Sequence, residues 1–560
     1  MPVSLICYFR WDPLCSCNEI ACLSKGMTNR LINKNVDIYK FPQVFEKNLG
    51  SITLGDLHGN PIKLIHFLFR QQIIQFKEEV KHAEETYQHF VTLYEQYGDI
   101  LQEYLENRTL LQFAHVKRDN AQERIANLEK QLREVNSDSQ LSQALSLLHQ
   151  QALLKLETAE NEHGQLQQKL AAPKEKMAYC ICQFNQFMGQ LVIRDNQTLI
   201  RLIGDEVADR GNCDYFTLRI LNLLNHNHCP LTILASNHGS EFIHAFEQLI
   251  TGHLLLPAGY IGDVQITSFW GLKLLLEHNL IQQEELIQLV NESYKPGLKI
   301  LDYTLSEQGI TLFSHAPIRF DALQLLAAKL EVHYDDSSTT ALAATIDQMN
   351  QRFQSYIDKN TLYTLFITET IHDRTQMSEE ERTTWPLVYF FWNRWNEIKE
   401  TETARPAIHN NYCVTYVHGH DGYQSLLPHV HNLDTACGKE ARTIENERIN
   451  KAFLFIRENQ NKAVDKTTAE SYIREVLRYK VFDSDERSLP PSLRHDNKHL
   501  KSSYNNECNN SIKKLGLLGK PIIMAGASDD FKISTPPSTP RELILASEEQ
   551  DDNILFNLSS

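Results

Sequence analysis

Five short apolar runs, spread over most of this chain, each end in residues that can bind a metal ion or a phosphate group. The runs cover residues 52–54, 199–203, 231–235, 310–313 and 413–417. The segments that follow them are Gly-Asp-Leu-His-Gly from Gly55, Gly-Asp-Glu-Val-Ala-Asp-Arg-Gly from Gly204, Ser-Asn-His from Ser236, Ser-His from Ser314 and Gly-His-Asp from Gly419. Short apolar runs of this kind are typical of buried strands. Open α/β sheets bind ligands at the carboxyl ends of their strands, so we expect one site at one edge of a sheet.

The side chains at these strand ends form a mixed set of nitrogen and oxygen donors. The candidate metal ligands are Asp56, His58, Asp205, Asn237, His315 and His420. Such a set suits Mn, Fe or Zn better than Ca or Mg. We expect two divalent metal ions, with Mn first and Fe or Zn as alternatives that ligand type does not separate. Two cations about 3.5–4 Å apart polarise phosphoryl oxygens and activate water, so no protein nucleophile is needed. The pattern predicts a two-metal phosphate-ester hydrolase.

Such a reaction also needs a proton for the leaving oxygen and a clamp for the phosphate. His238 directly follows Asn237, so we expect it at the rim of the site as the general acid. We expect Asp209 to fix the tautomer of His238 and to raise its pKa. Arg210 can donate two hydrogen bonds to phosphate oxygens. A second phosphate ligand is expected at Arg394.

Each of these features taken alone has an ordinary structural explanation. One Gly-Asp-x-His-Gly segment arises by chance, and a buried histidine such as His315 is usually a core residue with satisfied hydrogen bonds. Trp392 and Trp395 favour core packing over stacking on a substrate. His418 is an alternative ligand to His420, although Gly419 beside His420 favours the latter. The order and strand-end placement of all five segments outweigh these explanations.

Length and composition limit the remaining possibilities. A chain of 560 residues is too long for one ordinary core, so we expect two or three domains. A net charge of −16 argues against a nucleic-acid groove, and no apolar stretch is long enough to span a bilayer. Residues 1–23 lack the basic leader and the long apolar core of a signal peptide.

The chain has eleven cysteines, and they are sparse and lie mostly inside apolar runs. We therefore expect reduced thiols. The alternative is a zinc site at Cys7, Cys15, Cys17 and Cys22, whose spacing is irregular.

A long polar stretch with helical patterning separates the first two strand ends. Ile125, Leu128, Leu132 and Val135 recur at steps of three and four, and a second such stripe, which includes Leu141, Leu145, Leu148 and Ala152, follows the break at residues 136–139. The pattern predicts an inserted antiparallel helical hairpin, at residues 71–186, that projects from the body. Two functions stay open for it: a docking arm for a protein partner, or an insertion that packs only on itself.

Further helices are expected in residues 321–397 and 445–479, with a last strand at residues 432–435. Residues 442–527 are expected to form a mostly helical carboxyl-terminal region. Residues 528–560, with Glu-Glu-Gln-Asp-Asp at 548–552, have the composition of a disordered acidic tail.

The five segments resemble those of the calcineurin-like metallophosphoesterases, and more narrowly those of the phosphoprotein phosphatase family and its bacterial relatives. That family carries Gly-Asp-x-His-Gly, Gly-Asp-x-x-Asp-Arg-Gly, Gly-Asn-His-Glu, a histidine after a later strand, and Gly-His. The matching positions are Asp56, His58, Asp205, Asp209, Arg210, Asn237, His238, His315 and His420. This chain has one extra residue between Asp205 and Asp209, and Ser236 and Gly239 replace two residues of the third motif. Trp392-Asn393-Arg394 resembles the Trp-x-Arg of the bacterial members, whose arginine binds phosphate.

The resemblance implies an α/β (α+β) fold, a β-sandwich flanked by helices, with its core in residues 31–70 and 187–441. A hairpin between the first two motifs and an added carboxyl-terminal region resemble the Wip-type effector phosphatases of Legionella. The resemblance thus implies a soluble metal-dependent phosphatase acting on phosphoproteins, made in a bacterial cytoplasm and exported into a host cell. Phosphotyrosine and phosphoserine or phosphothreonine stay equally open as substrates. The alternatives are a nucleotide or dinucleoside polyphosphate hydrolase, and an adaptor with an inactive phosphatase core.

Overall fold

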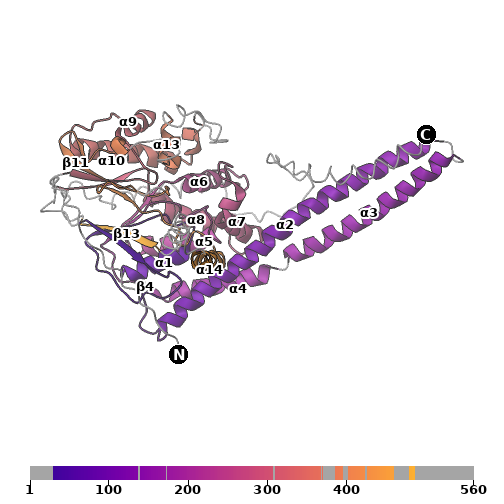
Figure 1. Ribbon diagram of the computed structural model, residues 1–560, viewed down its shortest axis with the longest axis horizontal. Coiled ribbons are helices and arrows are strands. Elements are labelled where there is room, and N and C mark those ends of the chain that lie inside the picture. Colours follow the sequence, from indigo (N-terminus) through magenta and orange to yellow (C-terminus); the bar gives the residue numbers. More distant parts are fainter. Residues whose placement is uncertain are drawn as a thin grey trace, which may run out of the picture. The chain divides into compact units, whose positions relative to one another are not determined.

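The computed structural model describes residues 29–135, 139–171, 173–306, 309–366, 369, 385–394, 402–422, 425–458 and 478–485. The chain divides into two compact units (Figure 1). The sandwich unit comprises Met1–Lys81, Leu191–Phe269 and Leu286–Leu489. Of the residues that the structure describes, the hairpin unit comprises His82–Gln190 and Trp270–Glu285. The first 28 residues, with the alternative cysteine site, and the acidic tail lie outside the described residues.

The first sheet of the sandwich unit carries three of the five predicted strand ends. It has six strands in the order β1 (Arg30–Asn35), β13 (Arg478–Ser484), β2 (Ser51–Leu54), β5 (Leu199–Leu202), β6 (Leu231–Leu234) and β7 (Leu298–Lys299). Strands β2, β5, β6 and β7 are parallel to one another, whereas β13 is antiparallel to both β1 and β2. The residues that follow β2, β5 and β6 therefore meet at one edge.

The second sheet carries the other two strand ends. Its order is β10 (Ile408–His409), β11 (Tyr412–His418), β9 (Gly309–Phe313) and β8 (Asp302–Leu305), and β12 (Val430–Asn432) pairs with β11. The pairing of β9 with β11 is parallel, so the residues after both strands also meet. A short two-stranded sheet joins β3 (Ile74–Phe76) to β4 (Leu191–Ile193).

The two large sheets enclose the main core of the sandwich unit. Residues from both sheets pack together there, and they are Ile203, Leu234, Phe313, Val417, Leu433 and Phe482. Arg201 of β5 reaches the other sheet, where its Nε donates to Asp302 Oδ2 at 2.7 Å and its guanidinium lies 3.9 Å from the Phe313 ring centroid. A buried charge needs such a partner, so this pair joins the sheets without an uncompensated ion. The expected mixed helix and sheet fold is confirmed.

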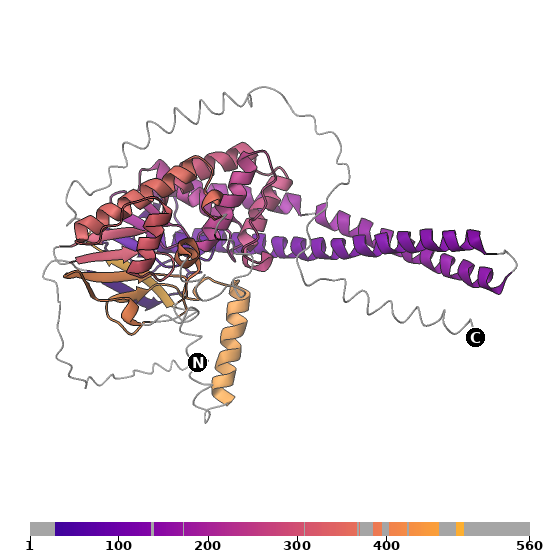
Figure 2. The same cartoon turned by 90° about the horizontal axis from the view of Figure 1, so that it is seen from above.

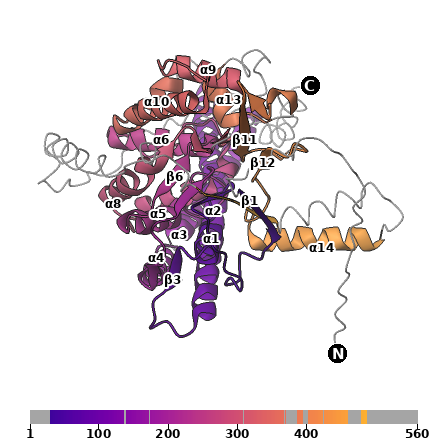
Figure 3. The same ribbon diagram turned by 90° about the vertical axis from the view of Figure 1, so that its left-hand side faces the viewer.

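Helices flank the strands of the sandwich unit. They include α1 (Pro61–Arg70), α5 (Asp214–His226), α6 (Asn237–Ile250), α9 (Phe320–Lys329), α10 (Thr339–Asp358), α11 (Tyr363–Phe366) and α13 (Pro386–Trp392). Helix α14 (Arg442–Glu458) also belongs to this unit. In Figure 3, α9, α10 and α13 gather beside β11. The first turns of α1 and α6 are capped by side chains: Asn60 Oδ1 accepts from the amides of Ile62 and Lys63, and Ser236 Oγ accepts from the amide of Gly239. These caps fix where α1 and α6 begin, directly after two of the strand ends.

The hairpin unit is built from α2 (Ala83–Glu134), α3 (Gln140–Ala171) and α4 (Lys174–Gly189). Long stretches of α2 and α3 run side by side (Figures 1 and 2). Their buried contact residues are Ile125, Leu128, Leu145 and Ala152, with Leu132, Val135, Leu148 and Leu156 packed against them. All of these residues except Leu156 belong to the two stripes read from the sequence, so the predicted helical hairpin is confirmed, although Leu141 of the second stripe is exposed. Two further helices of the chain are α7 (Thr267–Glu277) and α8 (Gln283–Leu289).

Two sequence-based expectations differ from the structure. The long helix α2 begins at Ala83 rather than near Gln71, because Ile74–Phe76 pairs as β3 with β4. The helix expected over residues 445–479 ends at Glu458 in α14, residues 459–477 lie outside the described part, and Tyr479 belongs to strand β13. Tyr479 and Val481 of β13 are fully buried between β1 and β2, so long-range strand pairing outweighs local helical preference there.

Within the described residues, no helix has the length and apolar character of a membrane span. The cysteines that the structure describes are free thiols, and Cys180, Cys213, Cys229 and Cys437 among them are buried.

Candidate metal and phosphate site

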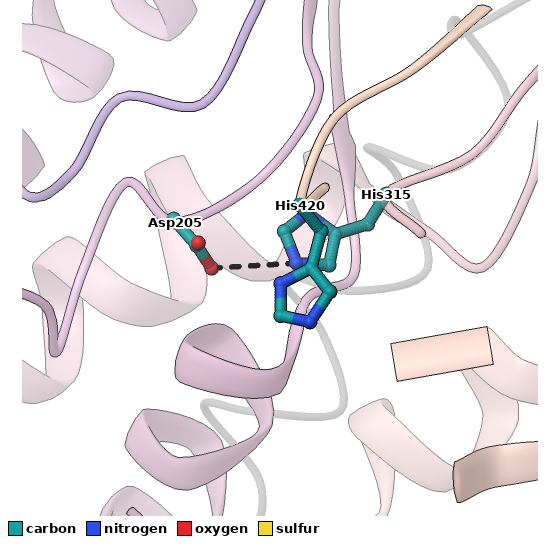
Figure 4. Close-up of side chains that lie close together, drawn as sticks. All are labelled: Asp205, His315 and His420. Atoms are coloured by element: carbon teal, nitrogen blue, oxygen red, sulfur yellow. Dashed lines mark ion pairs between the residues drawn. The ribbon is translucent and has the colours of Figure 1, made fainter. Parts of the chain in front are cut away.

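All six candidate metal ligands lie at the strand ends of the sandwich unit. Each of them is exposed by 5% or less of its surface, and they are Asp56, His58, Asp205, Asn237, His315 and His420. Figure 4 shows that Asp205, His315 and His420 point toward one another although they follow β5, β9 and β11. The predicted convergence of side chains from distant parts of the chain is therefore present.

One group of possible ligand atoms belongs to Asp205, His315 and His420, which lie within 4.8 Å of one another. His315 Nε2 is 3.6 Å from Asp205 Oδ1 and 3.0 Å from Asn237 Oδ1. The other ring nitrogen of His315 lies 3.0 Å from the carbonyl oxygen of Ile203, to which it can only donate. Metal-binding histidines usually donate one N–H in this way, which leaves the second nitrogen free to bind a cation.

A second group is formed by His58, Asp205 and Asp209, again within 4.8 Å. His58 Nε2 lies 2.9 Å from the Thr435 carbonyl oxygen, so it is the donor, and Nδ1 faces Asp209 Oδ2 at 3.4 Å. Asp56 Oδ2 accepts from the amide of His420, a member of the first group, at 2.8 Å. Asp205 belongs to both groups, so its carboxylate could bind a cation in either.

Two carboxylate oxygens of the candidate ligands lack a hydrogen bond among the described residues. They are Asp56 Oδ1 and Asp205 Oδ1, and both are buried. Burial raises the pKa of Asp56 well above its ordinary value, and the negative charges of Asp434 and Asp205 raise it further. Buried anions that repel one another need a compensating cation. The residues present therefore fit divalent metal ions.

The backbone at the site adopts conformations that side-chain-bearing residues rarely take. His58, Asp205, Ala208 and His420 have φ values of 58°, 57°, 51° and 56°, in the left-handed region. Each costs on the order of 1–2 kcal/mol relative to the right-handed region. Such strain gathers at functional sites, where surrounding structure holds it.

Glycine is required where chain segments approach the ligands most closely. A Cβ atom added at Gly419 would lie 1.7 Å from Asp56 Oδ1, and one added at Gly204 would lie 2.6 Å from His315 Nδ1. Gly419 therefore makes room for the Asp56 side chain, and Gly204 makes room for the His315 side chain.

The predicted proton donor and phosphate ligands lie at the same edge. His238 Nε2 is 3.5 Å from Asp209 Oδ1, and Arg210 Nη1 donates to that oxygen at 3.1 Å. Burial opposes the ionisation of Asp209, but the charges of His238, His58 and Arg210 outweigh it and lower the pKa of Asp209. The Arg210 side chain is 31% exposed, so it can reach a substrate while the ligands stay buried.

The structure also gives the positions of Arg394, of the alternative ligand His418 and of Trp392. Arg394 Nε lies 3.5 Å from His420 Nε2, beside the first ligand group. His418 belongs to neither ligand group: its Nε2 faces Arg405 Nη1 at 3.2 Å, and burial with the nearby Arg405 charge lowers its pKa to about 3. Trp392 is buried in an aromatic cluster with Phe366, and Trp395 lies outside the described residues.

Several residues at the site were missed by sequence reasoning. Asp434 Oδ1 lies 3.3 Å from His58 Nε2, and Lys63 Nζ donates to the Asp56 carbonyl oxygen at 2.5 Å. Asp434 was expected inside the last strand, at residues 432–435, but β12 ends at Asn432, so Asp434 follows a strand end as the predicted ligands do. Lys63 lies within the apolar α1 and gave no such signal.

Comparisons with known proteins identify the two regions separately. A family profile described as "WipA-like, phosphatase domain" matches residues 199–439, and one described as "WipA, alpha-helical hairpin" matches residues 85–188. Among solved structures, the chain is similar to the phosphatase domain of the Legionella effector WipB, with 26% identity and a TM-score of 0.45. That similarity covers 66% of this chain and 99% of the WipB domain. No curated protein matches the chain.

Proposed function

We propose that this chain is a WipA-like phosphatase that removes phosphate from phosphoproteins with the help of two divalent metal ions; the matches to the WipA-like phosphatase domain and helical hairpin support this. The observation that carries the proposal is the convergence of buried carboxylates and imidazoles from five strand ends around Asp205, with carboxylate oxygens left for a cation. Membership of the phosphoprotein phosphatase family is part of the proposal and is supported by the motifs at Asp56, Asp205 and His420.

We assign one cation to the first ligand group, Asp205, His315 and His420, together with Asn237, whose Oδ1 lies 3.0 Å from His315 Nε2. We assign the other cation to His58 and Asp205 of the second group together with Asp56, whose Oδ1 lacks a hydrogen bond. Asp209 of the second group is left to pair with His238 and Arg210. Bound there, the cations supply Lewis-acid chemistry, which lowers the pKa of water and offsets the charge of the phosphoryl oxygens. Mn is the expected metal, with Fe and Zn as alternatives.

The remaining steps belong to side chains of this chain. Arg210 and Arg394 bind and orient the phosphate group, since a guanidinium can donate two hydrogen bonds to its oxygens. His238 gives the proton on Nε2 to the leaving oxygen, and Asp209, 3.5 Å away, stabilises the charged imidazole. The burial of every ligand keeps bulk water away from the charges, which strengthens their interactions with the phosphate.

The hairpin and the tail extend the proposal beyond the site. The hairpin exposes Leu147 and Leu154 on α3, by 57% and 65% of their surface, which supports a docking arm for a protein partner. Export into a host cell rests on the likeness of the acidic segment 548–552 to effector export signals.

The test is hydrolysis of a mixed panel of phosphotyrosine, phosphoserine and phosphothreonine peptides, with Mn added and then chelated. We expect peptide hydrolysis that chelation abolishes and that nucleotides compete for only weakly. Asp205→Asn and His238→Ala should remove the activity, whereas Asp119→Asn, an exposed acidic residue on α2, should not. Strong preference for nucleotides, or full activity of Asp205→Asn, would overturn the proposal.

A further inference from the structure

The second motif of this chain carries one residue more than the family pattern, and the structure shows what that residue does. Ala208 stands directly before Asp209 and has a φ of 51°. In this left-handed conformation its amide and its carbonyl both turn to side chains of the site. The extra residue is therefore built into the site rather than looped out to solvent, and it is fully buried.

The carbonyl of Ala208 meets the proposed general acid. Its oxygen lies 2.5 Å from Nδ1 of His238. A carbonyl oxygen can only accept a hydrogen bond, so Nδ1 is the protonated nitrogen at this contact. The other nitrogen, Nε2, then faces Asp209 Oδ1 at 3.5 Å.

The amide of Ala208 is held by a buried carboxylate outside the ligand set. It donates to both oxygens of Asp214, at 3.0 and 3.1 Å, where Asp214 begins α5. Ser268 connects this contact to Asp209: its Oγ accepts from the Asp209 amide at 2.9 Å, and its side chain also bonds to Asp214. Asp214 and Ser268 are both fully buried, so the peptide before Asp209 is fixed from two sides.

We propose that Ala208, clamped by Asp214, is a positioning residue: its carbonyl oxygen holds the Nδ1–H of His238, so that Nε2 is the nitrogen that faces the site and, in the doubly protonated ring, carries the proton to be transferred. The inference rests on the proposed function. As the ester P–O bond breaks, the leaving oxygen takes the Nε2 proton and departs as a neutral alcohol or phenol. Water supplies the oxygen of the new P–O bond, its proton goes to solvent, and solvent restores the proton on Nε2. The Ala208 carbonyl oxygen holds Nδ1 and thereby keeps Nε2 turned toward the site. Without this acceptor, the imidazole ring of His238 is no longer held in that orientation.

The test compares two substrates that differ in their need for a proton. Phenyl phosphate has a strongly basic leaving group, whereas 2,4-dinitrophenyl phosphate has a weakly basic one that departs without a general acid. Deleting Ala208 should lower kcat for phenyl phosphate by about 100-fold and kcat for the dinitrophenyl ester by no more than about threefold. Asp214→Ala should lower kcat for phenyl phosphate by a smaller factor and should again leave kcat for the dinitrophenyl ester nearly unchanged. Asp214→Asn keeps one acceptor oxygen, so its kcat for phenyl phosphate should lie between those of Asp214→Ala and the wild type.

Two further variants separate positioning from general damage. Ala208→Gly keeps the carbonyl and adopts positive φ freely, so it should keep the wild-type ratio of the two rates. Glu247→Ala is the matched control: Glu247 is also a buried carboxylate that accepts two backbone amides, from Leu362 at 2.6 Å and Tyr363 at 3.1 Å. Its loss should affect both substrates equally.

A direct readout of the tautomer is available from the metal-free protein. Nitrogen-15 NMR of labelled histidine should show His238 protonated on Nδ1 in the wild type, and a shift toward the other tautomer in Asp214→Ala. Equal losses on both substrates in the deletion and in Asp214→Ala, with an unchanged tautomer, would overturn the inference. A wild-type protein that hydrolyses neither ester would instead contradict the proposed function.

Discussion

The strand-end site and the core of the helical hairpin are both buried, yet different interactions hold them. At the site, four residues with side chains take left-handed backbone conformations, and buried carboxylates lie side by side. In the hairpin, aliphatic side chains such as Ile125, Leu128 and Leu145 pack without any buried charge among them. The site thus gives up stability to hold reactive groups in place, and the hairpin core gives up none. Substitutions at the site should therefore change activity more than stability, and substitutions in the hairpin core should do the reverse.

The largest effect is expected for Asp205→Asn. It removes the carboxylate that both ligand groups share, so hydrolysis of an aryl phosphate should fall by roughly 1,000-fold or more. The metal-free variant should be at least as stable as the metal-free wild type, because a buried anion has been neutralised. Steady-state kinetics and urea unfolding check the two halves of this prediction. A strongly destabilised variant would break the comparison.

Removal of the metal should act on one unit only. A ligand that binds the folded state at 100 times its Kd stabilises it by about 2.7 kcal/mol. Chelation should therefore lower the melting temperature of the sandwich unit and leave the helical signal of the hairpin in place. Hydrogen exchange measured with and without chelator tests this, and equal loss of protection in α3 and β5 would count against it.

In the hairpin core, Leu145→Ala should lower the free energy of unfolding strongly. Leu145 is 4% exposed within the contact of α2 and α3, and its truncation should cost about 2–5 kcal/mol in the stability of that unit. Turnover of an aryl phosphate should stay at the wild-type level. Leu147→Ala, at a position 57% exposed on the same helix, is the control and should stay within about 0.5 kcal/mol. Loss of turnover in Leu145→Ala would show that the hairpin supports the site.

The smallest expected effect on stability tests whether the backbone at Ala208 is strained. Ala208→Gly should raise the free energy of unfolding by about 1 kcal/mol, because glycine adopts its φ of 51° without penalty. Ala245→Gly, in the interior of α6, should lower it by about the same amount, because glycine disfavours helices. Chemical unfolding of both variants measures the difference, and the same sign for both would argue against strain at Ala208.

The site and the hairpin can be read from the sequence for different reasons. The ligands of the site follow apolar runs directly, so local patterns are enough to locate Asp56, Asp205, His315 and His420. The apolar residues of the hairpin recur at steps of three and four, which is the period of an α-helix and can be recognised within each helix separately. Both signals are local: the structure confirms the hairpin and brings Asp205, His315 and His420 together, while their binding of a metal stays a prediction.

What the sequence did not reveal depends on long-range pairing. Strand β13 inserts between β1 and β2 from more than 400 residues further along the chain, and its residues read locally as the end of a helix. Asp214 and Ser268 support the site through backbone contacts, so their residue types give no pattern at any fixed spacing. The extra residue Ala208 was visible as a departure from the family motif, but only the structure shows its contact with His238.

The most direct test of the account is the anomalous scattering of crystals of the whole chain grown with Mn. Two peaks should appear, one bound by Asp56, His58 and Asp205 and the other by Asp205, Asn237, His315 and His420. If the protein preparation used for the crystals is active and the crystals nevertheless show no Mn peak at these residues, the account is contradicted.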